Sequence, residues 1–268
     1  MQPEIDVLGI SIKTFGVMFA LAFLASGAVV ARRMRELGRP VDWAYEMGFA
    51  ALVGGLVGAR AYYFVEEYDS AKEDILGAIF SGGGLVWYGG LIGGALGVVA
   101  WAAWRGILNL RLLDIAAPAL AVGYAVGRGG CQVSGDGDYG DPSGVPWAMA
   151  YPDGAVPTEE RVHPTPIYET LAMGLAAWVL WRWRDAFRPG VLFAVYLMLA
   201  GIERFLVEFV RRNDEVLVGL TAPQLQSLGL FLAGAAWLVV VRSRHGGLRA
   251  RVPETAPAAP LRSASDRV

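Results

Sequence analysis

Long uncharged apolar blocks constrain this chain more than any other feature of its sequence. Residues 14–31, 75–104 and 216–241 contain no charged side chain. An α-helix rises about 1.5 Å per residue, so about 20 apolar residues cross the hydrocarbon core of a bilayer. The whole chain is 55% hydrophobic and only 18% charged, which is more apolar and less charged than is usual for a soluble domain. We therefore predict an integral membrane protein.

Apolar segments of helix length predict an all-α fold, a polytopic bundle of about seven transmembrane helices. The predicted helices cover residues 14–31, 44–65, 85–104, 112–130, 165–183, 190–210 and 223–241. Residues 1–241 are therefore interpreted as one seven-span domain. Residues 242–268 are rich in arginine, alanine and proline and lack apolar periodicity, so we interpret them as a disordered cytoplasmic tail.

Glycine recurs at four-residue spacing in three of the predicted helices. The residues are Gly54 and Gly58, then Gly89, Gly93 and Gly97, then Gly123 and Gly127. This spacing puts small residues on one helix face and lets two helix backbones approach closely. We expect close helix–helix contacts at these positions.

The distribution of arginine predicts the orientation of the chain in the membrane. The segments after the first, third, fifth and seventh predicted helices are rich in arginine, whereas segments 66–74 and 136–160 are rich in acidic residues. Short loops rich in lysine and arginine stay in the cytoplasm. We therefore place the N-terminus outside and the C-terminus inside the cell.

This orientation brings the unusual polar residues to one depth, on the extracytoplasmic side. They are Arg60, Tyr88, Arg128, His163, Tyr168, Glu169, Arg204 and Glu208. An ionisable group at membrane depth costs at least about 2.5 kcal/mol unless it is paired or faces water, so the set indicates a polar cavity. Arg204 and Glu208 are four residues apart and share a helix face. Either the charges neutralise one another and fasten the helices together, or the arginines bind an anion such as phosphate.

The segment AVGRGGCQVSGDGDYG (125–140) bears on this choice. Arg128 closes an apolar run, and a glycine-rich turn with Asp136, Asp138 and Tyr139 follows. An arginine next to freely bending backbone offers the N–H donors that an anionic head group at a membrane surface needs. The same pattern also fits an arginine that reaches the membrane surface beside an exposed loop.

Composition constrains other classes of function. The net charge of −2 argues against a nucleic-acid partner. A single cysteine, Cys131, excludes an intrachain disulfide and a multi-cysteine zinc site. We expect no metal and no cofactor.

Six motifs follow one another between residues 57 and 228. They are VGARAYYFVEE (57–67), WYGGLIGG (87–94), GRGGCQVSGDGDYG (127–140), VHPTPIYE (162–169), ERFLVEFVRRND (203–214) and GLTAPQLQSL (219–228). Together they resemble the prolipoprotein diacylglyceryl transferases of bacteria, in the same order and over roughly residues 10–240. One such motif is weak, but six in order are specific to that family.

The resemblance implies an enzyme that transfers the diacylglyceryl group of phosphatidylglycerol to the lipobox cysteine thiol of a pre-prolipoprotein. The reaction forms a thioether and releases glycerol phosphate, as the first step of lipoprotein maturation. The implied partners are phosphatidylglycerol, lipobox-containing pre-prolipoproteins and the lipid bilayer. The implied location is the bacterial inner (cytoplasmic) membrane, with the active site on the extracytoplasmic side. Such chemistry needs fixed cations for the phosphate and a base or a field that favours the thiolate.

The resemblance also suggests roles for individual residues. Arg128 and Arg204 match the family's essential arginines and would hold the phosphate. Many members have a histidine, proposed to activate the thiol, where this chain has Tyr88. His163 is the alternative catalytic candidate, or it merely orients its loop. The remaining residues expected to bind substrate are Arg60, Gly89, Gly90, Asp136, Tyr168 and Glu208.

Two residues near Arg128 receive more specific expectations. Asp136 is expected to organise Arg128. Cys131 stands where the best-known members have asparagine, and we expect it to act as a small apolar residue and not as a nucleophile.

Two other functions stay open at this point. Because of the differences at Tyr88 and Cys131, the chain could be a family paralogue that acts on a different lipid or thiol. It could also be a transporter or a non-enzymatic lipid- or anion-binding membrane protein that uses the same arginines. The polar residues stop at one side of the membrane, which argues against a transport path.

Overall fold

The computed structural model describes residues 1–7, 9–67 and 86–250, and within them the chain is mainly helical. The long helices are α1 (Thr14–Glu36), α2 (Asp42–Glu66), α5 (Trp87–Trp104), α6 (Leu110–Ser134), α7 (Thr165–Arg182), α8 (Val191–Val207) and α9 (Ala222–His245). Each predicted helix is present, with ends that differ by a few residues. By length and composition, α1, α2, α6 and α9 are able to cross a membrane, and α5 is a shorter apolar helix. The fold is therefore that of a helical, multi-pass membrane protein.

Local signals explain where the helices begin and end. The side chain of Asn109 caps α6 by accepting a hydrogen bond from the backbone N–H of Arg111 at 2.9 Å, and Gly135, with φ of 61°, ends it. Thr221 and Gln224 form a capping box at the start of α9, which satisfies two N–H groups that the helix cannot pair.

The C-terminal part of α9 changes the predicted domain boundary. The helix continues through His245, so the expected boundary between residues 241 and 242 falls inside it. Beyond the helix, the N–H of Arg188 donates to the carbonyl of Leu248 at 2.9 Å, and the N–H of Ala250 donates to the carbonyl of Ala186 at 3.1 Å. The rest of the predicted tail, residues 251–268, lies outside the described residues.

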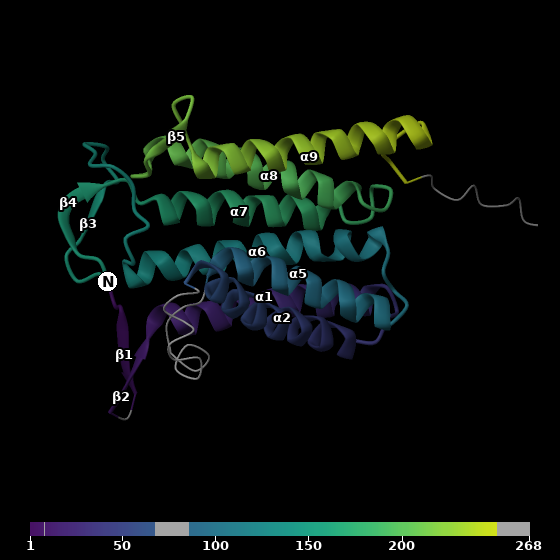
Figure 1. Cartoon of the computed structure of the whole chain (residues 1–268), viewed down its shortest axis with the longest axis horizontal. Helices are drawn as coiled ribbons and strands as arrows, with labels where there is room; N and C mark the ends of the chain where they lie inside the picture. Colours follow the sequence, from purple (N-terminus) through teal and green to yellow (C-terminus); the bar gives the residue numbers. More distant parts are fainter. Residues whose placement is uncertain (8, 68–85, 251–268) are drawn as a thin grey trace, which may run out of the picture.

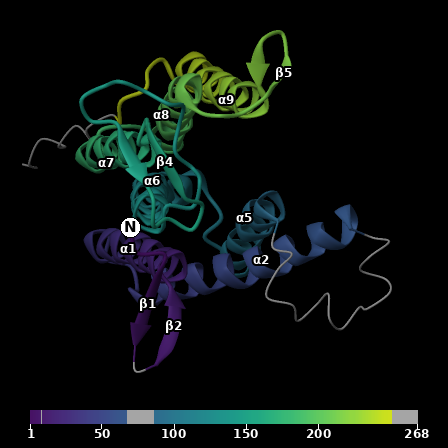
Figure 2. The same cartoon turned by 90° about the vertical axis from the view of Figure 1, so that its left-hand side faces the viewer.

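The helices lie side by side along the longest axis of the molecule (Figure 1). Helix α6 contacts α1, α7 and α8, while α8 also packs on α9, and α2 packs mainly on α5. Figure 2 shows the two sides of this arrangement, with α7, α8 and α9 on one side of α6 and α1, α2 and α5 on the other. Helix α6 is therefore the central element, and its C-terminal end carries Arg128.

Glycines explain the tight pairing of α2 with α5. A Cβ atom on Gly58 would collide with the carbonyl oxygen of Gly89, and one on Gly54 would collide with that of Gly93. These contacts confirm the close approach predicted from the spacing. In α6 the prediction holds for Gly123, which faces Ser26, but not for Gly127, because a Cβ there would meet no atom within 4 Å.

In the part of the chain that the structure describes, three short antiparallel hairpins lie at one end of the bundle, and they were not predicted from the sequence. They are β1 (Glu4–Val7) with β2 (Ile10–Lys13), β3 (Met149–Tyr151) with β4 (Thr158–Val162), and β5 (Glu215–Leu217) with β6 (Leu220–Thr221). They precede α1, join α6 to α7 and join α8 to α9, so they lie at the left-hand end in Figure 1. The rings of Tyr139 and Tyr151 stack there, with centroids 4.9 Å apart.

Candidate active site

Three arginines converge on one buried carboxylate at the end of the bundle that carries the hairpins. Glu169, in the second turn of α7, is fully buried. Its oxygens lie 3.1 Å from Nε of Arg128, 3.2 Å from Nη1 of Arg204 and 3.7 Å from Nη1 of Arg211. The hydroxyl of Tyr124 also donates to it, at 3.1 Å. A buried carboxylate is tolerated only when it is paired in this way.

Two further carboxylates complete the cluster. Asp138 pairs with Arg128 and accepts from Nη2 of Arg211 at 2.7 Å. Glu208 lies 2.9 Å from Nη2 of Arg204 and also accepts from the Thr221 hydroxyl at 2.9 Å. The last pair confirms the shared helix face predicted for Arg204 and Glu208. We call Arg128, Arg204, Arg211, Asp138, Glu169 and Glu208 the arginine–carboxylate network.

The network balances three positive charges with three negative ones. Arginine is therefore not in surplus among these six residues. The guanidinium groups are nevertheless not fully enclosed, because the side chains of Arg204 and Arg128 are 21% and 18% exposed, against 10% for Arg211. The side chains of Arg128 and Arg204 therefore keep some exposed surface that an anion could contact, whereas most of the Arg211 side chain is buried within the network.

Backbone geometry places Asp138 against the arginines. Its carbonyl oxygen accepts from Nη1 of Arg211 at 3.0 Å and from the hydroxyl of Thr165 at 2.5 Å. A Cβ on Gly140 would collide with the carbonyl oxygen of Val210, so only glycine lets this loop approach the end of α8 so closely. Burial alone would raise the pKa of the Asp138 carboxyl, but the charges of Arg128 and Arg211 outweigh it and hold that pKa below its ordinary value. Asp138 is therefore ionised near neutral pH and fixes both arginines.

His163 and Tyr168 form a separate polar group beside the network. Nδ1 of His163 lies 3.1 Å from the Tyr168 hydroxyl, which accepts a hydrogen bond from Nε1 of Trp147 at 2.6 Å. The phenolic proton is thus available to Nδ1, an arrangement that favours the His163 tautomer protonated on Nε2. The backbone carbonyl of His163 also accepts from the N–H of Gly140 at 2.8 Å. This geometry favours an orienting role for His163.

Tyr88, Gly89, Gly90 and Arg60 lie on the α2–α5 pair. Tyr88 is 43% exposed as a residue, and its hydroxyl accepts a hydrogen bond from Nε2 of Gln226 at 2.7 Å. This bond joins α5 to α9, which lie on opposite sides of α6 in Figure 2. Among the described residues, no hydrogen bond or ion pair joins Tyr88 or Arg60 to the arginine–carboxylate network. The predicted site residues thus fall into two groups.

The two glycines of this pair differ in their surroundings. A Cβ on Gly89 would collide with Gly58 and Tyr62, whereas one on Gly90 would meet its neighbours at an ordinary 3.7 Å. Helix packing alone therefore accounts for glycine at residue 89. It does not account for glycine at residue 90.

Asp136 and Cys131 lie next to Arg128 but do not form its ion pairs. Asp136 accepts from the backbone N–H of Asp138 at 3.3 Å, so Asp138, and not Asp136, organises Arg128. Sγ of Cys131 lies 3.9 Å from Nη1 of Arg128. Ligand atoms of Cys131, Asp136 and Asp138 lie within 4.8 Å of one another, yet Asp138 is already neutralised by two arginines, which disfavours a cation there.

The model of the family "Prolipoprotein diacylglyceryl transferase" matches residues 3–240 of this chain. The chain belongs to this family. Its relatives carry the name phosphatidylglycerol–prolipoprotein diacylglyceryl transferase. The protein of Clostridium tetani is 30% identical, covering 87% of this chain and 95% of the relative. The protein of Finegoldia magna is 32% identical, covering 85% of this chain and 91% of the relative. That of Geobacter sulfurreducens is also 32% identical, covering 92% of this chain and 98% of the relative.

Proposed function

We propose that this chain transfers the diacylglyceryl group of phosphatidylglycerol to the lipobox cysteine thiol of pre-prolipoproteins. In this reaction a C–S bond forms, the C–O bond to the phosphate breaks, glycerol phosphate leaves and the thiol gives up its proton. The observation that carries the proposal is the arginine–carboxylate network, in which buried carboxylates hold Arg128 and Arg204 in place while each keeps an exposed surface. The family membership and the names of the relatives support the same reaction.

We further propose that all seven helices cross the bacterial inner membrane, with the N-terminus outside and the C-terminus inside. The C-terminal ends of α1, α5, α7 and α9 lie at the end of the bundle opposite the network, and arginines follow or close each of them. The positive-inside rule then puts this end in the cytoplasm. The network faces the outer side, where a translocated pre-prolipoprotein arrives.

Arg128 and Arg204 bind the phosphate in this proposal. Negative charge grows on the leaving phosphate as the C–O bond breaks, and guanidinium groups that are already in position stabilise it without reorganisation. Glu169, Glu208 and Asp138 are positioning residues, because each contacts an arginine. Arg211 is also a positioning residue, since it pairs with Asp138 and Glu169.

Tyr88 is the candidate we favour for accepting the thiol proton, which its oxygen can do only after the hydroxyl has given up its own proton. Nδ1 of His163 is occupied by Tyr168, and in the tautomer favoured by that contact Nε2 already carries a proton. Tyr88 is an exposed residue at the start of α5. A cationic field around the thiol would help such a transfer because it would stabilise the thiolate. Asp136, Tyr168, Arg60, Gly89 and Gly90 complete the substrate site in this proposal.

A transfer assay tests the function. Purified protein is given phosphatidylglycerol with a labelled acyl chain and a lipobox peptide, and label on the peptide thiol is measured. We expect transfer by the wild type and a loss of about 100-fold or more in Arg128→Ala, as for removal of one transition-state donor. Arg212→Ala is the matched control, because Arg212 lies at the same end but pairs with the exposed Glu160 at 3.4 Å.

The outcomes separate the proposed function from its alternatives. Unchanged transfer by a folded Arg128→Ala variant would refute the role of the network. A folded wild type that binds phosphatidylglycerol but labels no peptide would support a non-enzymatic lipid-binding protein or a paralogue with another thiol substrate.

A further inference from the structure

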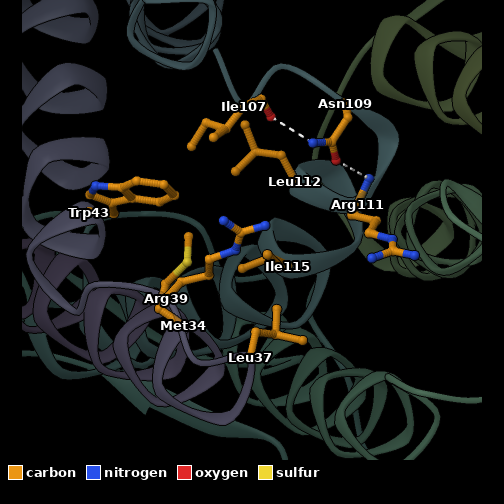
Figure 3. Close-up of a pocket in the computed structure, with 9 residues that line it drawn as sticks. All are labelled: Met34, Leu37, Arg39, Trp43, Ile107, Asn109, Arg111, Leu112 and Ile115. Atoms are coloured by element: carbon orange, nitrogen blue, oxygen red, sulfur yellow. Dashed lines mark hydrogen bonds between the residues drawn. The ribbon is translucent and has the colours of Figure 1, made fainter. Parts of the chain in front are cut away.

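A pocket lined by both apolar and basic side chains lies at the end of α6 opposite Arg128. It is an open pocket of about 150 Å³ between the α1–α2 and α5–α6 connections (Figure 3). The lining residues are Met34, Leu37, Arg39, Trp43, Ile107, Asn109, Arg111, Leu112 and Ile115. Ile115 and Arg128 are 13 residues apart on one helix, a separation of about 20 Å at 1.5 Å per residue. The pocket is therefore distinct from the arginine–carboxylate network.

The floor of the pocket is a fixed apolar surface. Met34, Leu112 and Ile115 are 2%, 6% and 8% exposed and belong to the core cluster between α1, α2, α5 and α6. The two connections above it are also held in place, since the N–H of Arg39 donates to the carbonyl of Met34 at 2.9 Å. The side-chain amide of Asn109 donates to the carbonyl of Ile107, also at 2.9 Å. The pocket thus exists before any ligand arrives.

The rim of the pocket is cationic. None of the nine lining residues is acidic, and Figure 3 shows Arg39 reaching into the pocket between Trp43, Leu112 and Ile115, with Arg111 at the edge. Within the described part of the chain, neither arginine has a carboxylate partner. Asp42, next to Trp43, does not line the pocket, and two other acids near this end have partners of their own. Glu36 pairs with Arg33 at 3.1 Å and with Arg184 at 2.9 Å. Glu46 pairs with Arg105.

We propose that this pocket binds an anionic phospholipid from the leaflet opposite the network. Arg39 and Arg111 would contact the phosphate, while an acyl chain would begin on the apolar floor beside Trp43. A volume of about 150 Å³ is below the roughly 300–1,000 Å³ of pockets for drug-sized ligands. The pocket therefore takes the region near the glycerol, and the rest of the chains lies along the exposed helix faces. Basic residues and tryptophan at a membrane surface suit such a ligand.

The test measures lipid contact with Trp43 and not enzyme activity, so it is independent of the proposed function. Full-length protein in phosphatidylcholine nanodiscs receives small amounts of phosphatidylserine with brominated acyl chains, which quench tryptophan on contact. The fluorescence of Trp43, and its quenching, is obtained as the difference between the wild type and Trp43→Phe. Brominated phosphatidylcholine in the same amounts is the zwitterionic comparison.

We expect Trp43 to be quenched at a lower fraction of phosphatidylserine than of phosphatidylcholine. Arg39→Gln and Arg111→Gln should each weaken this preference about fivefold, as expected for one cation near a lipid surface. Arg35→Gln is the matched control, because Arg35 is an exposed arginine near the same end of α1 that does not line the pocket, and it should leave the preference unchanged.

Three results would overturn the proposal. The first is equal quenching of Trp43 by the two lipids. The second is an equal effect of Arg35→Gln and Arg39→Gln, which would show a general surface charge and no site. The third is complete reversal of the quenching by soluble glycerol phosphate at low millimolar concentration, which would show a site for a free phosphate.

Discussion

Glu169 offers the sharpest test of how the network is held together. Glu169→Gln keeps the shape of the side chain and removes its charge, which leaves three arginines against Asp138 and Glu208. Removing one partner from a buried ion-pair cluster costs about 3–5 kcal/mol. For a chain of this size, each kcal/mol lowers the melting temperature by about 2–4 °C, so we expect a fall of roughly 6–20 °C. Transfer activity should also fall, because Arg128 and Arg204 lose a ligand that positions them.

Glu203→Gln is the matched control for this variant. Glu203 lies next to Arg204 on α8, and its Oε1 is buried without a hydrogen-bond partner. Within the described ranges it forms no ion pair, whereas Glu169 pairs with three arginines. Replacing a poorly satisfied buried carboxylate by an amide should change stability little or increase it. Both melting temperatures are measured on detergent-purified protein with labelled phosphatidylglycerol transfer as the second readout. If Glu203→Gln is destabilised as strongly as Glu169→Gln, the ion pairs of Glu169 are not what holds the network together.

Other residues give further expectations. The pKa of Asp138 is lower in the folded protein than in the unfolded chain, where it is about 3.9. The stability that the Asp138 carboxylate contributes is therefore present above the unfolded pKa and is lost as the pH falls through the lower folded value. The melting temperatures of the wild type and Asp138→Asn should converge only below about pH 4. Cys131→Ser should keep most transfer activity, and its complete loss would point to a covalent enzyme intermediate. Tyr88→Phe should lower kcat by about 100-fold or more if Tyr88 accepts the thiol proton, and His163→Ala should do less; the reverse order in folded variants would move the base to His163. Gly89→Val should lower the melting temperature because its side chain would collide with Gly58 and Tyr62, whereas Gly174→Val, where a Cβ would meet no atom within 4 Å, should not.

The helices could be predicted because their signal is local. An uncharged run of 18 residues such as 14–31 has few alternatives to a helix in a membrane, where every backbone group must be paired internally. Four-residue glycine spacing likewise predicted close contacts on these faces of α2 and α5, but not that the two helices pack on each other. The hairpins were missed because β3 and β5 have only three residues each. Their pairing depends on which helix ends the bundle brings together, and such short segments carry little pattern of their own.

Part of the arginine–carboxylate network, which is the candidate site, was predicted for the same reason. Arg128, Arg204 and Glu208 could be named because charges in apolar segments are unusual, and the Arg204–Glu208 pair follows from helical spacing. The sequence did not single out Asp138 over Asp136, because the choice depends on how the turn folds against Arg211. The central role of Glu169 also required the structure, since its arginine partners come from two segments far apart in the sequence, α6 and residues 204–211.

Charge balance in the network connects the fold to the proposed reaction. An unpaired arginine at membrane depth costs at least about 2.5 kcal/mol. Three arginines are therefore tolerated there only because carboxylates pair with them. A neutral network also holds an anion less tightly than three free arginines would. Phosphatidylglycerol brings one negative charge, and the released phosphate monoester carries about −1.5 to −2 near neutral pH. In the proposed reaction the arginines would thus be fixed where charge develops during bond breaking, while their carboxylate partners would compete with the product and favour its release.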